Sequence, residues 1–232
     1  MKITSIRVVQ PQSSTMPKGW RGTMGQIVVA IDTDAGLTGY GIGGGGAAAI
    51  HVVQQELAPL LLGEDAAPVE ELWERMYRTT LAYGRKGLAI MAISGVDLAL
   101  WDLRGKAASL SVAQVLSPSP AVDVAAYFTV GLAADNSIEG TERGLAKGYN
   151  AIKLGVGGLS LPQDTQRLLE GVGQVRRRIG GHVALMADAA MAWSDRDLVL
   201  ELAQSLAEFD LDWLEEPLAA DDLDGYAWLA ER

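Results

Sequence analysis

Apolar and polar residues alternate in two different ways along this chain, and the change comes near residue 120. In the first part, three short runs have the period-two alternation of strands: residues 3–9, 25–33 and 37–42. Three longer runs have helical spacing: residues 47–62, 69–82 and 86–106. The third of these is apolar on nearly every face, which indicates a helix buried between other elements. The first part is therefore expected to contain antiparallel strands followed by helices.

Beyond a Ser- and Pro-rich linker at residues 117–120, strand and helix patterns take turns. The predicted strands are residues 123–130, 150–154, 183–188 and 212–215. The predicted helices are residues 138–147, 163–179, 195–209 and 223–231. Four β/α units in series with short loops indicate a parallel sheet or barrel, and four units are half of an eight-fold barrel. We expect an α+β domain at residues 1–120 and an incomplete (β/α) barrel at residues 121–232.

Charged residues close three of the predicted barrel strands. Lys153, Asp188 and Glu215 each lie at a strand exit. The carboxyl ends of successive strands in a β/α repeat face the same mouth, so these side chains should converge. Two carboxylates and an amine suggest a divalent cation and a proton-transfer base. Exposed strand-end acids are the alternative, but recurrence at equivalent positions of consecutive units favours a site.

Composition removes several classes of function. The net charge of −10 argues against nucleic acid or an anionic membrane as a partner. The densest basic run, Arg176 to Arg178, ends a predicted helix, where it complements the helix dipole. The absence of cysteine excludes disulfides and thiolate chemistry and fits a cytoplasmic protein. The most apolar stretch, residues 88–96, is too short to span a bilayer.

Other polar candidates have simpler interpretations. Residues 41–46 formally match a dinucleotide-binding fingerprint, but they follow the return strand of a hairpin, so a flexible turn is favoured. His51 and His182 are expected to be structural or solvated rather than general bases. Asp97 and Asp102, in the apolar helix, are expected to cap or to form ion pairs.

Three segments resemble the mandelate racemase/muconate lactonizing branch of the enolase superfamily. They are AISGVDLALWDLRGK at residues 92–106, ADAAMAW at 187–193 and WLEEP at 213–217. The resemblance implies an α+β capping domain followed by a modified (β/α) barrel. It also implies Mg²⁺ held by three carboxylates on consecutive strands, with Asp188 and Glu215 as two of them.

The chemistry that this resemblance implies is abstraction of a proton α to a carboxylate, giving an enediolate stabilised by the metal. Lys153 would be an electrostatic partner of the substrate carboxylate or an auxiliary acid/base. The loop at residues 16–23 would close over the substrate, with Trp20 and Arg21 as candidate substrate-binding residues; they are equally well interpreted as ordinary surface residues. The predicted function is a Mg²⁺-dependent lyase that removes water from an acid sugar, acting as a homo-oligomer.

Three departures from the family pattern qualify this prediction. Gly155 stands where many members carry a second, proton-abstracting lysine, and Ala190 replaces a common asparagine. Both favour an acid-sugar dehydratase over a racemase or cycloisomerase. The third metal ligand would fall about one β/α unit beyond Glu215, near position 240, so a C-terminally truncated chain is expected. The remaining alternative is a catalytically inactive remnant.

Overall fold

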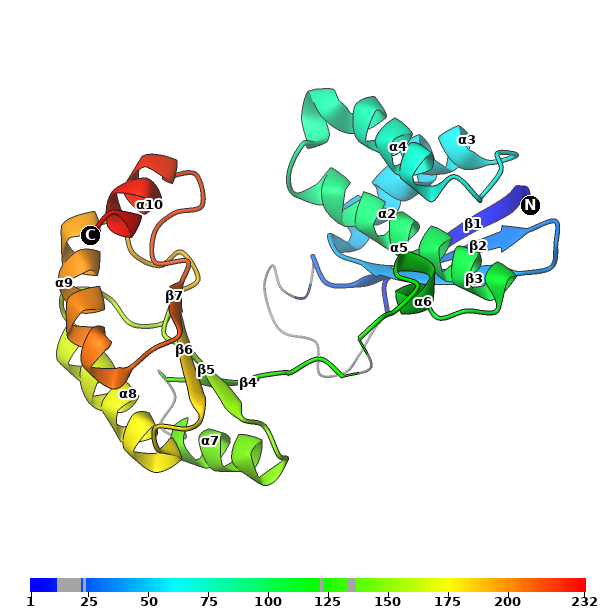
Figure 1. Cartoon of the computed structure of the whole chain (residues 1–232). Coiled ribbons are helices and arrows are strands. Elements are labelled where there is room, and N and C mark those ends of the chain that lie inside the picture. Colours follow the sequence, from blue (N-terminus) through cyan, green and yellow to red (C-terminus); the bar gives the residue numbers. More distant parts are fainter. Residues whose placement is uncertain (12–21, 23, 122, 133–136) are drawn as a thin grey trace. The chain divides into compact units, whose positions relative to one another are not determined.

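The computed structural model of the 232-residue chain describes all residues except 12–21, 23, 122 and 133–136. The chain forms two compact units, Met1–Val122 and Asp123–Arg232 (Figure 1). In the described parts of the chain, no helix is long and apolar enough to cross a membrane.

The first unit has a three-stranded antiparallel sheet in the order β1-β2-β3. Its strands are β1 (Ile3–Val9), β2 (Ile27–Thr33) and β3 (Thr38–Gly43). Its helices are α2 (Gly46–Val52), a π-helical turn (Val53–Leu57), α3 (Ala58–Leu61), α4 (Val69–Gly84), α5 (Leu88–Ala108) and α6 (Val112–Leu116). The predicted antiparallel strands followed by helices are confirmed. The helix predicted at 47–62 is interrupted by the π turn, and the short α6 was not predicted.

The glycines of β3 allow α5 to lie directly against the sheet. Gly39, Gly41 and Gly43 alternate along the strand, and a Cβ on any of them would collide with the backbone of α5. Gly45, with φ +89°, precedes the first turn of α2. Close packing and a helix start therefore explain the glycine run, and only part of it forms the predicted turn.

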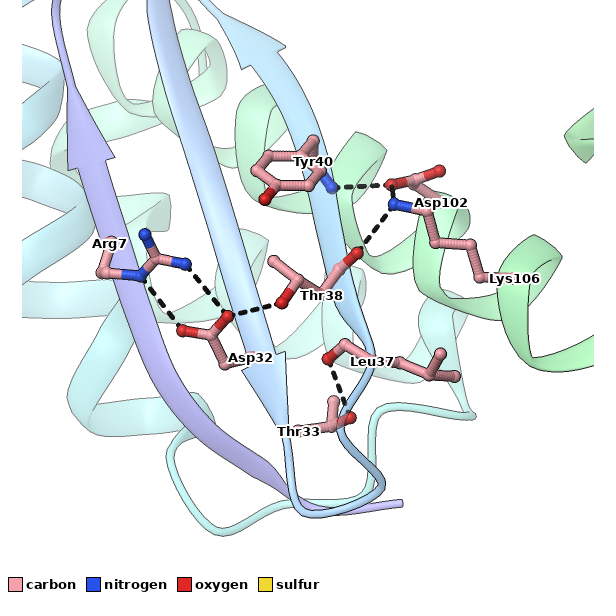
Figure 2. A network of polar contacts seen from close by, with 8 residues as sticks. All are labelled: Arg7, Asp32, Thr33, Leu37, Thr38, Tyr40, Asp102 and Lys106. Atoms are coloured by element: carbon pink, nitrogen blue, oxygen red, sulfur yellow. Dashed lines mark hydrogen bonds and ion pairs between the residues drawn. The ribbon is translucent and has the colours of Figure 1, made fainter.

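Side chains of α5 also satisfy the outer edge of β3, as Figure 2 shows. The Asp102 carboxylate accepts a hydrogen bond from the backbone N–H of Tyr40 at 2.8 Å. The Lys106 ammonium donates to the carbonyl of Thr38 and to Asp102, both at 2.7 Å. The predicted structural role of Asp102 is confirmed.

Two carboxyl groups of this unit have pKa values displaced in opposite directions. The Arg7 guanidinium forms two hydrogen bonds of 3.0 Å to Asp32, and Thr38 donates another of 2.7 Å (Figure 2). These bonds, with that from Arg7 the largest cause, hold the pKa of Asp32 below its ordinary value. Burial within α5, followed by repulsion from Glu70, raises the pKa of Asp97.

The second unit has a parallel sheet in the order β4-β5-β6-β7. Its strands are β4 (Phe128–Gly131), β5 (Ala151–Gly155), β6 (Ala184–Asp188) and β7 (Trp213–Glu215). Its helices are α7 (Ser137–Ala146), α8 (Thr165–Ile179), α9 (Arg196–Leu206), a 3₁₀ turn (Ala207–Phe209) and α10 (Leu223–Ala230). The predicted incomplete barrel is confirmed. The prediction of a strand over 123–127 is wrong, because β5 begins only at Ala151 and gives those exposed residues no pairing partner.

One face of this sheet packs against its helices in a continuous apolar core. The core contains alternate strand residues, among them Val130, Ile152, Leu154, Leu185 and Ala187. At the opposite end of the sheet from the strand exits, Arg176 at the end of α8 donates hydrogen bonds to the carbonyls of Phe209, Gly180, Val183 and Asp210, at 2.7–2.9 Å. This guanidinium therefore ties the end of α8 to the segments that lead into β6 and β7.

Candidate metal and acid–base site

The face of the sheet that points away from the core carries two rows of side chains. Successive strand residues point to opposite faces, so the alternates of the core residues form this second face. Strand register places Thr129, Lys153, Met186 and Trp213 in the first row. It places Gly131, Gly155, Asp188 and Glu215 in the second row. Every member of the second row is the last residue of its strand, so this row forms the mouth of the half barrel.

Lys153 reaches from the first row to both carboxylates of the second. Its ammonium nitrogen lies 3.0 Å from Asp188 Oδ2 and 3.2 and 3.1 Å from Glu215 Oε1 and Oε2. The Lys153 side chain is 10% exposed, whereas those of Asp188 and Glu215 are 22% and 35% exposed. The structure thus brings together the three residues that the sequence singled out.

The environment of Lys153 favours its charged form. Burial alone would lower the pKa of this ammonium, but the hydrogen bonds with Asp188 and then Glu215 outweigh burial and hold the pKa above its ordinary value. A charge-assisted pair of this kind is strong because each carboxylate faces a cation that little water reaches.

Backbone groups and an aromatic side chain fix the two carboxylates further. The N–H of Ala190 donates to Asp188 Oδ1 at 2.9 Å, and Ala190 has a positive φ of 49°. The indole N–H of Trp213 donates to Glu215 Oε2 at 3.1 Å. The backbone of Ala190 therefore helps to hold the Asp188 carboxylate in place.

Sequence reasoning missed two aromatic residues of the site. The Tyr127 ring lies 5.0 Å from the Lys153 ammonium nitrogen and packs edge-on against Trp213 at 6.2 Å between ring centroids. Trp213 precedes Glu215 by two residues on one strand, so alternation could have placed it on the same face. Tyr127 lies just before β4, which begins at Phe128, and alternation over the predicted strand at residues 123–130 would have placed it on the face of Thr129.

The other residues that the sequence singled out have different outcomes. Trp20 and Arg21 are outside the described residues, so their predicted role in substrate binding stays a prediction. His182 comes before β6, at the end of the strand remote from Asp188, and His51 lies in α2 of the first unit. Within the described residues of the second unit, His182 is therefore not part of the arrangement around Lys153.

The donor chemistry of the site fits a hard divalent cation. Mg²⁺ binds carboxylate oxygens and usually keeps several waters, so one or two protein carboxylates are a normal share of its coordination shell. Asp188 and Glu215 end adjacent paired strands and are both partly exposed. Within the described residues, no group of three or more His, Cys, Asp or Glu side chains is placed to hold a metal ion. The described chain therefore offers two protein ligands.

Comparison with known families gives two matches that together span most of the chain. Residues 3–117 match the family model for the mandelate racemase/muconate lactonizing enzyme N-terminal domain. Residues 137–232 match the model for the enolase C-terminal domain-like region.

Individual relatives agree. The chain is 38% identical to 3,6-anhydro-alpha-L-galactonate cycloisomerase of Streptomyces coelicolor, over 87% of this chain and 56% of that protein. It is 35% identical to arabinonate dehydratase of Saccharolobus solfataricus, over 89% and 56%. The chain thus spans little more than half the length of these relatives.

Solved structures show the same relationship. A racemase from Streptomyces coelicolor A3(2) with bound magnesium aligns with a TM-score of 0.82 and 34% identity, covering 99% of this chain and 66% of that one. L-Talarate dehydratase from Polaromonas sp. JS666, complexed with Mg and L-glucarate, aligns with a TM-score of 0.84 and 32% identity, covering 100% and 64%. With the family matches, the fold and the strand-end acids all in agreement, the chain belongs to the mandelate racemase/muconate lactonizing enzyme family of the enolase superfamily.

Proposed function

We propose that this protein is a Mg²⁺-dependent lyase that takes the proton α to a carboxylate and eliminates water from an acid sugar. The observation that carries the proposal is the pairing of Asp188 with Glu215 at the ends of adjacent strands, with Lys153 within 3.2 Å of both. Relatives named as arabinonate and L-rhamnonate dehydratases support the reaction class. Residues 1–120 would be the capping domain and 121–232 the first half of the barrel.

Each residue of the site has a task in this reaction. Asp188 and Glu215 would hold the cation, and when bound it would stabilise the negative charge that develops as the α-proton leaves. The Lys153 ammonium adds a fixed positive charge at the same mouth, where it would attract the substrate carboxylate. Trp213 and the Ala190 N–H each occupy one lone pair of a carboxylate and so limit its rotation.

The overall reaction balances without an added oxidant or reductant. The α-carbon loses its proton, the hydroxyl group on the next carbon leaves with a proton as water, and the resulting enol rearranges to a 2-keto acid. Gly155 has no functional group at the position beside Asp188, so the chain's described residues supply no second lysine for abstraction from that strand. This favours elimination over racemisation by a lysine of β5.

A cycloisomerase or racemase is the second candidate. Its support is that relatives at comparable identity are named as cycloisomerases, including D-galactarolactone cycloisomerase of Agrobacterium fabrum at 33%. The two reactions differ in their products, because a cycloisomerase yields an isomer of equal mass and a dehydratase releases water. A cytoplasmic location and a homo-oligomeric state stay predictions from the sequence.

Proton NMR in D₂O tests the proposal directly. The protein is incubated with Mg²⁺ and arabinonate or galactarate, with Asp188→Asn as the control variant. Elimination gives a 2-keto-3-deoxy acid that carries solvent deuterium at C3, and the control should form none. Exchange at C2 with the C2 epimer as the sole product would indicate a racemase, and an isomer formed without loss of water would indicate a cycloisomerase. No exchange and no product, together with no Mg²⁺ binding, would favour the inactive alternative.

A further inference from the structure

The strand-end row that carries Asp188 and Glu215 also carries two adjacent glycines, Gly131 and Gly155. A glycine in a strand is unfavourable by about 0.5–1 kcal/mol relative to alanine, since it loses more backbone entropy and packs no side chain. Strand glycines therefore usually mark a special backbone conformation, or the close approach of another chain segment or a ligand.

The close approach of another segment explains the glycines of β3, but neither that nor a special backbone conformation explains this pair. At Gly39, Gly41 and Gly43 the backbone of α5 occupies the position of a side chain. Among the described atoms, nothing lies within 4 Å of the point where a Cβ of Gly131 would be. A Cβ on Gly155 would meet, among the described atoms, only Val130 O at 3.8 Å and Gly131 Cα at 3.9 Å, which are ordinary contacts, and neither Gly131 nor Gly155 has a positive φ.

The space over these glycines adjoins the carboxylates. Gly155 is the direct strand partner of Asp188, and Gly131 is the direct partner of Gly155. The Lys153 side chain, in the first row, extends toward Asp188 and Glu215, and none of its atoms lies within 4 Å of the Cβ position of Gly155. Among the described residues of this unit, none therefore blocks a molecule held at the carboxylates from extending across the ends of β5 and β4.

We propose that Gly131 and Gly155 determine the length of acid that the site accepts. One end of a polyhydroxylated acid would be held at Asp188 and Glu215, and its carbon chain would lie over the two glycines. The inference rests on the proposed function and adds to it a direction for the substrate. A two-carbon hydroxy acid would need only the carboxylate end, whereas a five-carbon acid would also need the bare backbone of the glycines.

Isothermal titration calorimetry in saturating Mg²⁺ tests this with two ligands, glycolate and arabinonate. Gly155→Leu and Gly131→Leu fill the proposed space, and Gly155→Ala fills it partly. Gly181→Leu is the matched control, because a Cβ there also meets nothing within 4 Å but lies in the turn before β6, remote from the acids. A thermal melt of each variant establishes that it is folded.

The leucine variants should bind arabinonate at least about tenfold more weakly than the parent, because the added side chain would occupy the space of the ligand. They should bind glycolate and Mg²⁺ as the parent does. Gly155→Ala should show a smaller loss, which keeps the test open if a leucine variant fails to fold, and Gly181→Leu should show none. Undiminished arabinonate binding would overturn the inference alone. An equal loss of affinity for glycolate or for Mg²⁺ would also overturn it, because the substitutions would then act on the carboxylate site itself and not on the length of the acid. A parent that binds neither acid would overturn the proposed function as well.

Discussion

Replacement of Lys153 by methionine should destabilise the protein by leaving two acids without their shared cation. At 3.0–3.2 Å each of the two carboxylates contributes about 5 kcal/mol of attraction to the Lys153 ammonium at an effective dielectric constant of 20, before the cost of desolvation is subtracted. Removing one partner of a buried ion pair typically costs about 3–5 kcal/mol. Because Glu215 keeps 35% of its side chain exposed, water screens part of the effect. We expect a loss of about 2–3 kcal/mol in the free energy of unfolding.

Urea denaturation of the parent and of Lys153→Met, with and without millimolar Mg²⁺, measures this loss. If Asp188 and Glu215 hold the cation, Mg²⁺ should restore much of the lost stability, because it replaces the missing positive charge. The matched control is Lys147→Met, which removes an exposed lysine of the same unit; its ammonium lies 5.5 Å from the Phe128 ring centroid, so its loss should change the free energy by no more than about 1 kcal/mol. A loss in Lys153→Met below about 1 kcal/mol, or one that Mg²⁺ does not reduce, would refute this account of the site.

Three further predictions follow from other contacts. Arg176→Met should lower the free energy of unfolding by about 3 kcal/mol, since four carbonyls lose a charged donor, and Arg176→Lys should recover only part of it in urea titrations. If Arg176→Lys recovered the full free energy of unfolding, the four hydrogen bonds of the planar guanidinium would not be the source of the stability. Trp213→Phe should weaken Mg²⁺ binding about tenfold in calorimetry by freeing Glu215, and unchanged affinity would contradict that role. Because the pKa of Asp32 is lowered on folding, this group stabilises the protein above its unfolded pKa, and that stability is lost as the pH falls through its folded pKa. Because the pKa of Asp97 is raised on folding, stability is instead lost as the pH rises through its folded pKa. Asp32→Asn should therefore flatten the acid limb of the pH–stability curve and Asp97→Asn should raise stability at neutral pH; the opposite signs would contradict the assigned contacts.

Periodicity was sufficient to predict the elements because most of them bury one face. The helix α8 illustrates this, since its buried residues recur at helical spacing, whereas the strand β6 was recognisable as a short continuous apolar run. Lys153, Asp188 and Glu215 could be predicted to converge because parallel strands end at one edge. The helix α6 was missed although Ser111 and Gln114 form a capping box, a local signal that the sequence contains.

What the sequence could not provide were contacts that depend on register between strands. That Gly131 and Gly155 share a row with the acids follows only from pairing, and that Tyr127 lies against Lys153 depends on how the chain enters β4. The role of Arg176 was likewise only partly foreseen. A position at a helix end suggested a favourable dipole, whereas the guanidinium also bonds to carbonyls more than thirty residues away.

The contacts of Asp102 and Lys106 at the outer edge of β3 bear on solubility. An open strand edge presents unpaired N–H and carbonyl groups that can recruit a strand from another molecule, and natural proteins block such edges with charge. Asp102 occupies the N–H of Tyr40, and Lys106 occupies the carbonyl of Thr38, so the edge is closed to an incoming strand at both groups. Loss of the Asp102 carboxylate would expose the N–H of Tyr40, and loss of the Lys106 ammonium would expose the carbonyl of Thr38. Their loss should therefore appear first as concentration-dependent aggregation, seen by light scattering, in protein whose unfolding curve is still nearly normal.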